Sequence, residues 1–158
     1  MTTTQQTDIE KTLLLFMSAM NHWERNNQQD GQKLEAMAKN KSITDAQYYA
    51  TADSIVVKQR KEYFDIFETY AIPGLKEEDK KIGVMGSYGV PPKYDPENES
   101  IISTVKDSDT TSYIVTKVTN SIVDQHKYFL KLVAGKWLLY NKLFWIESAK
   151  KWIESGGL

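Results

Sequence analysis

The sequence has no cysteine among its 158 residues. This absence excludes disulfide bonds, thiolate catalysis and cysteine-based zinc sites, and it fits a reducing compartment, so a cytoplasmic location is the default expectation. Proline is scarce as well: there are four, and three of them (Pro91, Pro92 and Pro96) fall in one short segment. That segment separates a first part with helical apolar spacing from a second part with strand-like composition.

An excess of charge is also lacking, because 20 basic and 21 acidic side chains give a net charge of −1. Nucleic-acid binding requires clustered positive charge, so we expect no nucleic-acid partner. The apolar stretch 13–17 is too short and too amphipathic for a signal peptide or a membrane span. With 41% hydrophobic and 26% charged residues, the composition predicts one globular domain over residues 1–158 without membrane attachment.

The common motifs of enzymatic chemistry are missing. There is no His-x-x-x-His, no calcium-binding loop, no Gly-x-Ser-x-Gly elbow and no phosphate-binding loop. The glycines Gly83, Gly86 and Gly89 have the wrong spacing for a nucleotide loop, and we interpret them as bends or bulges in a sheet. We therefore predict no metal ion and no cofactor.

The first helix is predicted from a capping box formed by Thr7 and Glu10. We expect residues 1–7 to be flexible and the helix to begin near Asp8. One face of it carries the apolar residues Ile9, Leu13, Phe16, Met20 and Trp23. The polar residues 26–29 should end this helix, and Asp30-Gly31 predicts a turn before a short second helix that carries Leu34, Met37 and Ala38.

Thr44 and Gln47 form a second capping box. Helical spacing then continues over residues 45–70 and ends at Ile72-Pro73-Gly74, so the helical part covers residues 8–72. The β-branched run within residues 54–57 is the weak point of this long helix, where a local break is expected.

The second part of the chain, residues 82–146, has the composition of an antiparallel sheet. Strands are predicted over residues 82–87, 100–106, 110–119, 125–134 and 136–146, with turns at 107–109 and 134–135. Trp145, Ala149 and Trp152 recur at helical spacing and predict a short terminal helix over residues 147–155. Helices followed by an antiparallel meander indicate an α+β fold, with the helices packed on one face of a strongly bent sheet that forms a cone with a pocket at its mouth.

The proline-rich segment 87–99 is predicted to be a semi-rigid extended loop with exposed tyrosines and carboxylates. Exposed tyrosine is well suited to protein interfaces, and an acidic run suits a basic partner. Core packing is the expectation for Phe16, Trp23, Tyr63, Phe67, Phe129 and Trp137, which lie on apolar stripes.

The histidines offer one catalytic alternative. His126 lies two positions from Asp124, and a strand would place both on one face, where the pair could act as a general base. Together with Tyr113 they are the candidates for an isomerase, cyclase or dehydratase acting in the pocket of the cone. A strand end on the surface with an acid nearby is the simpler interpretation, and His22 is expected on a helix surface.

Three segments resemble one protein family: residues 16–24, which match its first-helix pattern; residues 87–99, which match its central loop; and residues 128–139, which match its penultimate hairpin. The family is that of the nuclear-transport-factor-like fold immunity proteins of bacterial polymorphic toxin systems, and the resemblance spans about Ile9 to Ile146. Lys93 departs from the pattern, where an acid is expected.

The resemblance implies a cone-shaped α+β fold, related to the cystatin-like roll, and a non-enzymatic antitoxin. Such a protein binds the toxic domain of a cognate secreted effector and protects the producing cell. No catalytic residues are carried over. On this hypothesis the partner-binding residues are Tyr88, Tyr94, Asp95, Glu97, Asn98, Glu99, Asp107 and Asp109. A pocket enzyme of the same fold is the alternative, and a homodimer formed through the outer face of the sheet is a further one.

Overall fold

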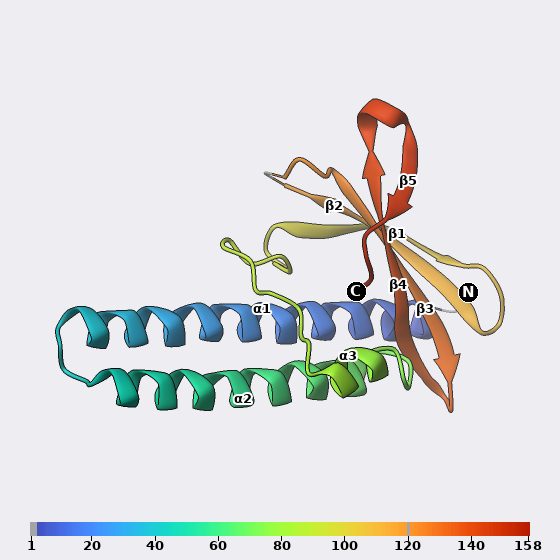
Figure 1. Cartoon of the computed structure of the whole chain (residues 1–158). Helices are drawn as coiled ribbons and strands as arrows, with labels where there is room; N and C mark the ends of the chain where they lie inside the picture. Colours follow the sequence, from blue (N-terminus) through green and yellow to red (C-terminus); the bar gives the residue numbers. More distant parts are fainter. Residues whose placement is uncertain (1–2, 120) are drawn as a thin grey trace.

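The computed structural model describes residues 3–119 and 121–158. Two long helices lie side by side, and a twisted sheet stands across one end of them (Figure 1). In chain order the elements are α1 (Thr3–Lys39), α2 (Asp45–Tyr70), α3 (Glu77–Ile82), β1 (Glu99–Lys106), β2 (Thr111–Val118), β3 (Gln125–Val133), β4 (Lys136–Ile146), the 3-10 turn η1 (Glu147–Ala149) and β5 (Lys151–Glu154). The predicted α+β class and antiparallel sheet are therefore confirmed.

The sheet is an antiparallel meander in the order β1-β2-β3-β4-β5. The β3–β4 register shifts by one residue, because Phe129 pairs with Asn141 and Leu130 pairs with Leu139. Tyr140 is thus an extra residue on β4, and such a bulge bends the strand and moves the inward positions by one. Leu139 faces the core before the bulge and Lys142 faces it afterwards.

The helix α1 is continuous, so the predicted turn at Asp30-Gly31 and the separate second helix are wrong. A glycine costs a helix about 1 kcal/mol, which contacts with α2 can offset. Here Asp30 pairs with Lys58 of α2 at 2.9 Å, and Leu34 is buried. The predicted start near Asp8 is also wrong, because residues 3–7 are already helical; the rest of the predicted flexible segment, residues 1–2, lies outside the described residues.

The helix α2 has the predicted bounds and the predicted capping box. The Gln47 N–H donates to Thr44 Oγ1 at 3.2 Å, and the Thr44 N–H donates to Gln47 Oε1 at 2.9 Å. The expected break within residues 54–57 does not occur. Packing against α1 explains this, since tertiary contacts readily exceed the few tenths of a kcal/mol by which β-branched residues disfavour a helix.

The core lies where both long helices meet the sheet. The α1 stripe that was predicted from the sequence is buried along its whole length, from Ile9 to Trp23. Phe16 is central: its ring packs edge-to-face against Phe67 of α2, with ring centroids 5.6 Å apart, and against Tyr94, with centroids 5.2 Å apart. The sheet contributes Ile114, Tyr128, Leu130, Trp137 and Leu139 to the same cluster.

Two predicted elements are absent from the described residues. The strand over 82–87 does not form: Ile82 ends α3, Gly83 caps that helix with a φ of 72°, and the backbone of Gly86 lies against the ring of Tyr63. These glycines are therefore not sheet bulges. The terminal helix is also wrong, because Trp145 and Trp152 face each other across the β4–β5 pair, with ring centroids 5.4 Å apart.

The β3–β4 hairpin gives a direct stability test. Both turn residues have positive φ, 47° at Ala134 and 78° at Gly135, as expected for a two-residue turn. Ala134→Gly relieves the left-handed strain and should raise the free energy of unfolding by about 0.5–1 kcal/mol. Ala36→Gly, in the exposed part of α1, is the control and should lower it by about 1 kcal/mol in the same denaturant titration.

Candidate functional site

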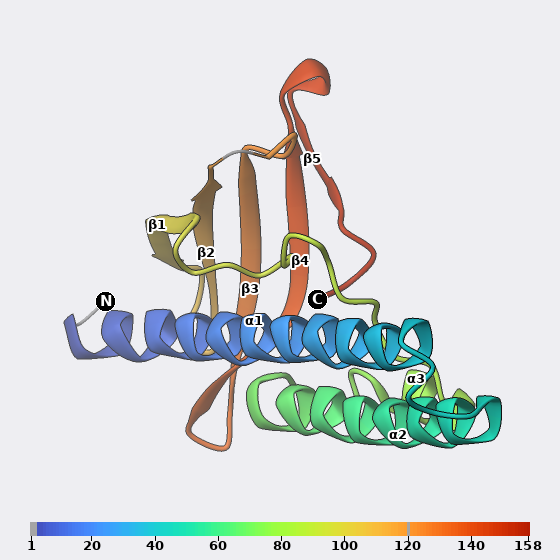
Figure 2. The same cartoon turned by 90° about the vertical axis from the view of Figure 1, so that its left-hand side faces the viewer.

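The segment between α3 and β1 crosses in front of the sheet, just above α1 (Figure 2). We refer to residues 87–98 as the cross-sheet loop. It has no strand or helix, and its Val90–Pro91 peptide bond is cis. Proline removes backbone donors, so the loop depends on contacts outside itself to hold its shape.

The carboxylate of Glu24 on α1 supplies the main contact. Its Oε2 accepts from the N–H of Gly89 at 2.6 Å and from the N–H of Lys93 at 2.9 Å, and its Oε1 accepts from the N–H of Tyr94 at 3.1 Å. Only 1% of Glu24 is exposed. Hydrogen bonds to an ionised acceptor are stronger than neutral ones, so this single side chain fixes three backbone positions of the loop.

Further contacts hold both sides of the same region. Asn21 Nδ2 donates to the carbonyl of Tyr94 at 2.6 Å, and Arg25 lies 3.8 Å from the carboxylate of Asp95. Within the loop, Lys93 Nζ donates to the carbonyl of Ser87 at 3.0 Å. Lys93, the position that departs from the family pattern, therefore closes the loop on itself. These contacts tie the loop to α1 and to its own first residue.

The structure separates the two tyrosines that were predicted to be exposed. Tyr88 is 39% exposed, as expected, but Tyr94 is 6% exposed, so its predicted exposure is wrong. Tyr94 packs on Phe16, and burial raises the pKa of its hydroxyl. The first-helix stripe and the loop therefore share one apolar contact, which spacing within either segment does not reveal.

Among the predicted polar contact residues, Glu97 and Asn98 are exposed and Asp95 is half-buried. Asp95 is engaged locally: its carboxylate accepts from the N–H of Glu97 at 3.0 Å and from Asn98 Nδ2 at 2.8 Å. The exposed residues of the predicted set on the cross-sheet loop are thus Tyr88, Glu97 and Asn98, on a backbone that Asp95 and Glu24 hold by hydrogen bonds.

Glu99, the first residue of β1, is buried, and its predicted exposure is wrong. Its Oε1 accepts from Thr116 Oγ1 at 2.5 Å and from the hydroxyl of Tyr128 at 2.9 Å, and it lies 2.8 Å from Nδ1 of His126. Burial alone would raise the pKa of Glu99, but the hydrogen bond and charge of His126, together with Thr116 and Lys142, lower it overall.

Asp107 and Asp109 are exposed but lie at the opposite end of β1 from the loop. A strand rises about 3.3 Å per residue, so these acids lie on the order of 25 Å from Glu97 and Asn98. The acidic run in the sequence is consequently two separate surface groups with a buried carboxylate between them.

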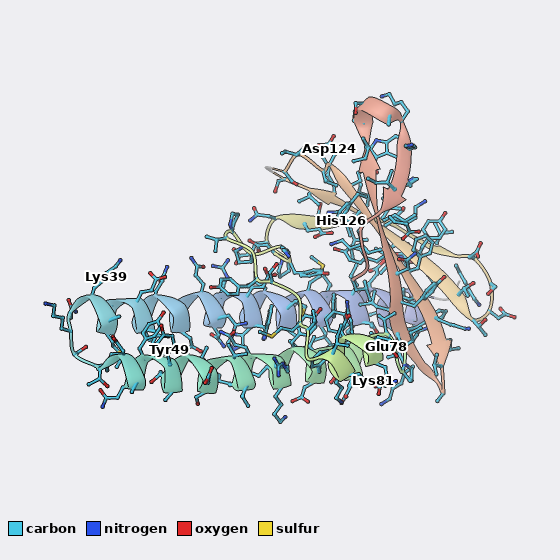
Figure 3. All side chains as sticks on the ribbon, viewed as in Figure 1. Lys39, Tyr49, Glu78, Lys81, Asp124 and His126 are labelled. Carbon is cyan, nitrogen blue, oxygen red and sulfur yellow. The ribbon has the colours of Figure 1, made fainter. Side chains whose placement is uncertain are left out.

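The proposed catalytic set is not brought together. Asp124 precedes β3 and is exposed, whereas His126 is 7% exposed and pairs with Glu99 (Figure 3). Tyr113 lies on the outer face of β2, where its ring contacts Phe129. His22 is exposed on α1, as expected. Within the described residues, no group of three or more His, Asp or Glu side chains could hold a metal ion.

A pocket of about 560 Å³ lies between the cross-sheet loop, the concave face of the sheet and the last residues of the chain. Its walls include Pro91, Val123, His126, Lys142, Phe144 and Leu158. Lys142 was missed by the sequence reasoning, because the bulge at Tyr140 reverses the inward and outward positions of β4. The polar Glu24 within the apolar stripe of α1 was a signal that could have been used.

A bent antiparallel meander that packs on two helices and encloses a pocket at its concave face defines an α+β cone, as in NTF2-like proteins. A model of the family described as NTF2 fold immunity protein matches residues 8–156, nearly the whole chain. The chain therefore belongs to this family of immunity proteins, which confirms the resemblance. No curated protein and no solved structure matched the chain. No helix in residues 3–119 and 121–158 is long and apolar enough to span a membrane.

Proposed function

We propose that the protein binds the toxic domain of a cognate secreted polymorphic toxin and blocks it, so that the producing cell is protected. Membership of the immunity family supports this function. The structural observation that supports toxin binding most is the cross-sheet loop. Glu24 holds the backbone of this loop, while the side chains of Tyr88 and Glu97 remain exposed. A preorganised loop loses little conformational entropy on binding.

In this proposal the partner contacts Tyr88, Asp95, Glu97 and Asn98 directly. Tyr94 and Glu99 act from beneath, by holding the loop and the start of β1. A standard interface of roughly 800 Å² per partner is on the order of 30 Å across, wide enough to reach Asp107 and Asp109 at its edge. The acids would face basic groups on the toxin, whose charge complementarity speeds encounter and fixes register.

The loop proposal predicts a selective loss of affinity. Tyr88→Ala combined with Glu97→Lys should weaken binding to the toxin domain at least 10-fold, because an exposed anchor is removed and a charge is reversed. Tyr49→Ala combined with Glu35→Lys is the matched control, since both side chains are exposed on the long helices. Tyr49 lies far from the sheet (Figure 3). Calorimetry should give wild-type affinity for the control. If both double variants bind the toxin domain with equal affinity, the interface does not include this loop.

The growth of bacteria that express the toxin domain tests the function itself. Co-expression of this protein should restore growth, and the loop variant should restore it less than the control variant. Failure of the wild-type protein to restore growth, although it is folded and abundant, would contradict the proposal.

One observation favours an enzyme as a second candidate. The Glu99–His126 pair lines the pocket, and a histidine oriented by a carboxylate can act as a general base. An isomerase or dehydratase of this kind would exchange the acidic protons of an enone or β-hydroxy-ketone substrate in D₂O. His126→Phe should abolish that exchange, whereas exchange unchanged in this variant would remove the candidate.

A further inference from the structure

The side chain of Lys142 is largely buried, and its ammonium group faces the pocket without a hydrogen-bond partner among the described residues. Only 5% of the residue is exposed, and within the described residues its Nζ makes no hydrogen bond and no ion pair. Lys142 lines the pocket between the cross-sheet loop and the sheet. An ammonium has three donors, and buried donors are normally satisfied. Those of Lys142 are available to whatever enters the pocket.

Aromatic rings surround this ammonium on several sides. Its Nζ lies 4.5 Å from the ring centroid of Tyr94, 5.1 Å from that of Tyr128 and 5.3 Å from that of Phe144. Cation–π contacts with the ring faces stabilise the positive charge, but they give the N–H donors no hydrogen-bond acceptor. Burial lowers the pKa of Lys142 to about 8 despite the opposing effects of Glu99 and Glu24, so its surroundings disfavour the charged form. Burying the charged form of Lys142 is therefore unfavourable, and an anion bound beside the ammonium group would offset that free energy.

We propose that this pocket binds a small organic monocarboxylate, with its carboxylate on Lys142 and its apolar body against the rings and aliphatic walls. The volume of about 560 Å³ is that of an ordinary small-molecule site. This site does not rest on the toxin-binding proposal, because its anchor is Lys142 in the concave interior. The two proposals share Asp95 and Asn98 of the pocket wall and the supporting Tyr94 and Glu99.

The charges around the pocket select a monoanion. The carboxylates of Glu99 and Glu24 attract the charge of Lys142. Lys93 is a second nearby cation, but its Nζ already donates a hydrogen bond to the carbonyl of Ser87. A dianion such as a phosphate monoester would therefore meet one unpaired cation and three carboxylates, those of Glu99, Glu24 and Asp95, which disfavours its second charge. The walls supply Pro91, Val118, Val123, Phe144 and Leu158, which fit an aromatic or aliphatic body.

The test compares acids with their neutral amides. Benzoate, phenylacetate and naphthalene-2-acetate are titrated into the full-length protein at pH 7, each beside its carboxamide, with binding followed by ligand-detected NMR and calorimetry. We expect at least one acid to bind 10-fold or more tightly than its amide. Lys142→Met, which keeps an unbranched side chain one atom shorter and without the charge, should abolish that preference and melt at the same temperature as the wild-type protein or higher.

A pH series of the wild-type protein supplies an independent readout. The titratable groups around Lys142 and its pocket are Glu99 of β1, Lys93, Tyr94 and Asp95 of the cross-sheet loop, His126 and Tyr128 of β3, and Glu24 of α1. Above pH 8, where the unliganded lysine loses its proton, affinity for the acid should fall by up to 10-fold per pH unit, while affinity for the amide stays constant. No binding of any acid at about 10 mM, equal affinity for acid and amide, or an acid preference that survives in Lys142→Met would overturn the proposal.

Discussion

Replacing Glu24 with alanine is expected to produce the largest loss of stability of any single polar substitution on α1. The change leaves the N–H groups of Gly89, Lys93 and Tyr94 without an acceptor under a loop that contains three prolines. Unsatisfied buried groups cost about 1–3 kcal/mol, and losing a charged acceptor costs more, so the free energy of unfolding should fall by about 2–4 kcal/mol. The free energy of unfolding is measured by denaturant titration, with tryptophan fluorescence as the signal.

Two controls separate the carboxylate from the surrounding packing. Glu24→Gln keeps the shape but offers only one acceptor oxygen, so we expect an intermediate loss. Glu35→Ala, on an exposed part of the same helix, should change stability by less than about 0.5 kcal/mol. Amide exchange at Gly89, Lys93 and Tyr94 should accelerate in Glu24→Ala. Wild-type exchange rates at these positions would show that Glu24 does not hold the loop.

Glu99→Gln is expected to have the second large effect, and one that depends on pH. The carboxylate is buried between Thr116, His126 and Tyr128. Losing hydrogen bonds to a buried charged acceptor costs about 1.5–3 kcal/mol, so an amide that keeps one acceptor oxygen should lower the free energy of unfolding by about 2–3 kcal/mol at pH 7.

The direction of the pH effect follows from the lowered pKa of Glu99. A carboxyl whose pKa is lower in the folded state stabilises the protein above its unfolded pKa and loses that contribution as pH falls through its folded pKa. The stability gap between wild type and Glu99→Gln should therefore be widest near pH 7 and narrow below about pH 4.5. Glu97→Gln, exposed on the loop, is the matched control and should show no such convergence. A stability difference between wild type and Glu99→Gln that stays constant from pH 7 to pH 3 would contradict the lowered pKa of Glu99.

Local sequence signals predicted the parts of the fold that local chemistry controls. The capping box at Thr44 gave the start of α2, and alternation of apolar and polar residues gave the strands β1 to β4 close to their true bounds. Where the prediction was wrong, a contact distant in the sequence decided the structure. Gly31 stays helical because α1 packs on α2, and Trp152 joins a strand because Trp145 lies opposite it.

The site was predicted only in part for the same reason. The cross-sheet loop could be found from its prolines, tyrosines and acids, but the side of the loop that faces inward depends on Glu24 and Phe16, which lie some seventy residues earlier. A glutamate within an apolar helical stripe was visible in the sequence and indicates a buried acceptor. Lys142 was not accessible to pattern analysis, since one extra residue on β4 determines which way it points.

The central claim, that this immunity-family protein neutralises a toxin by direct binding, is tested most directly by titrating it into its cognate toxin domain. The candidate partner is the variable carboxy-terminal domain of the large secreted protein that we expect to be encoded immediately upstream. Calorimetry and the residual toxic activity are measured on the same samples. We predict tight binding, with a dissociation constant in the nanomolar range or below, and loss of activity that follows occupancy. A toxin domain that remains active and unbound at micromolar concentrations of the folded protein would contradict the account.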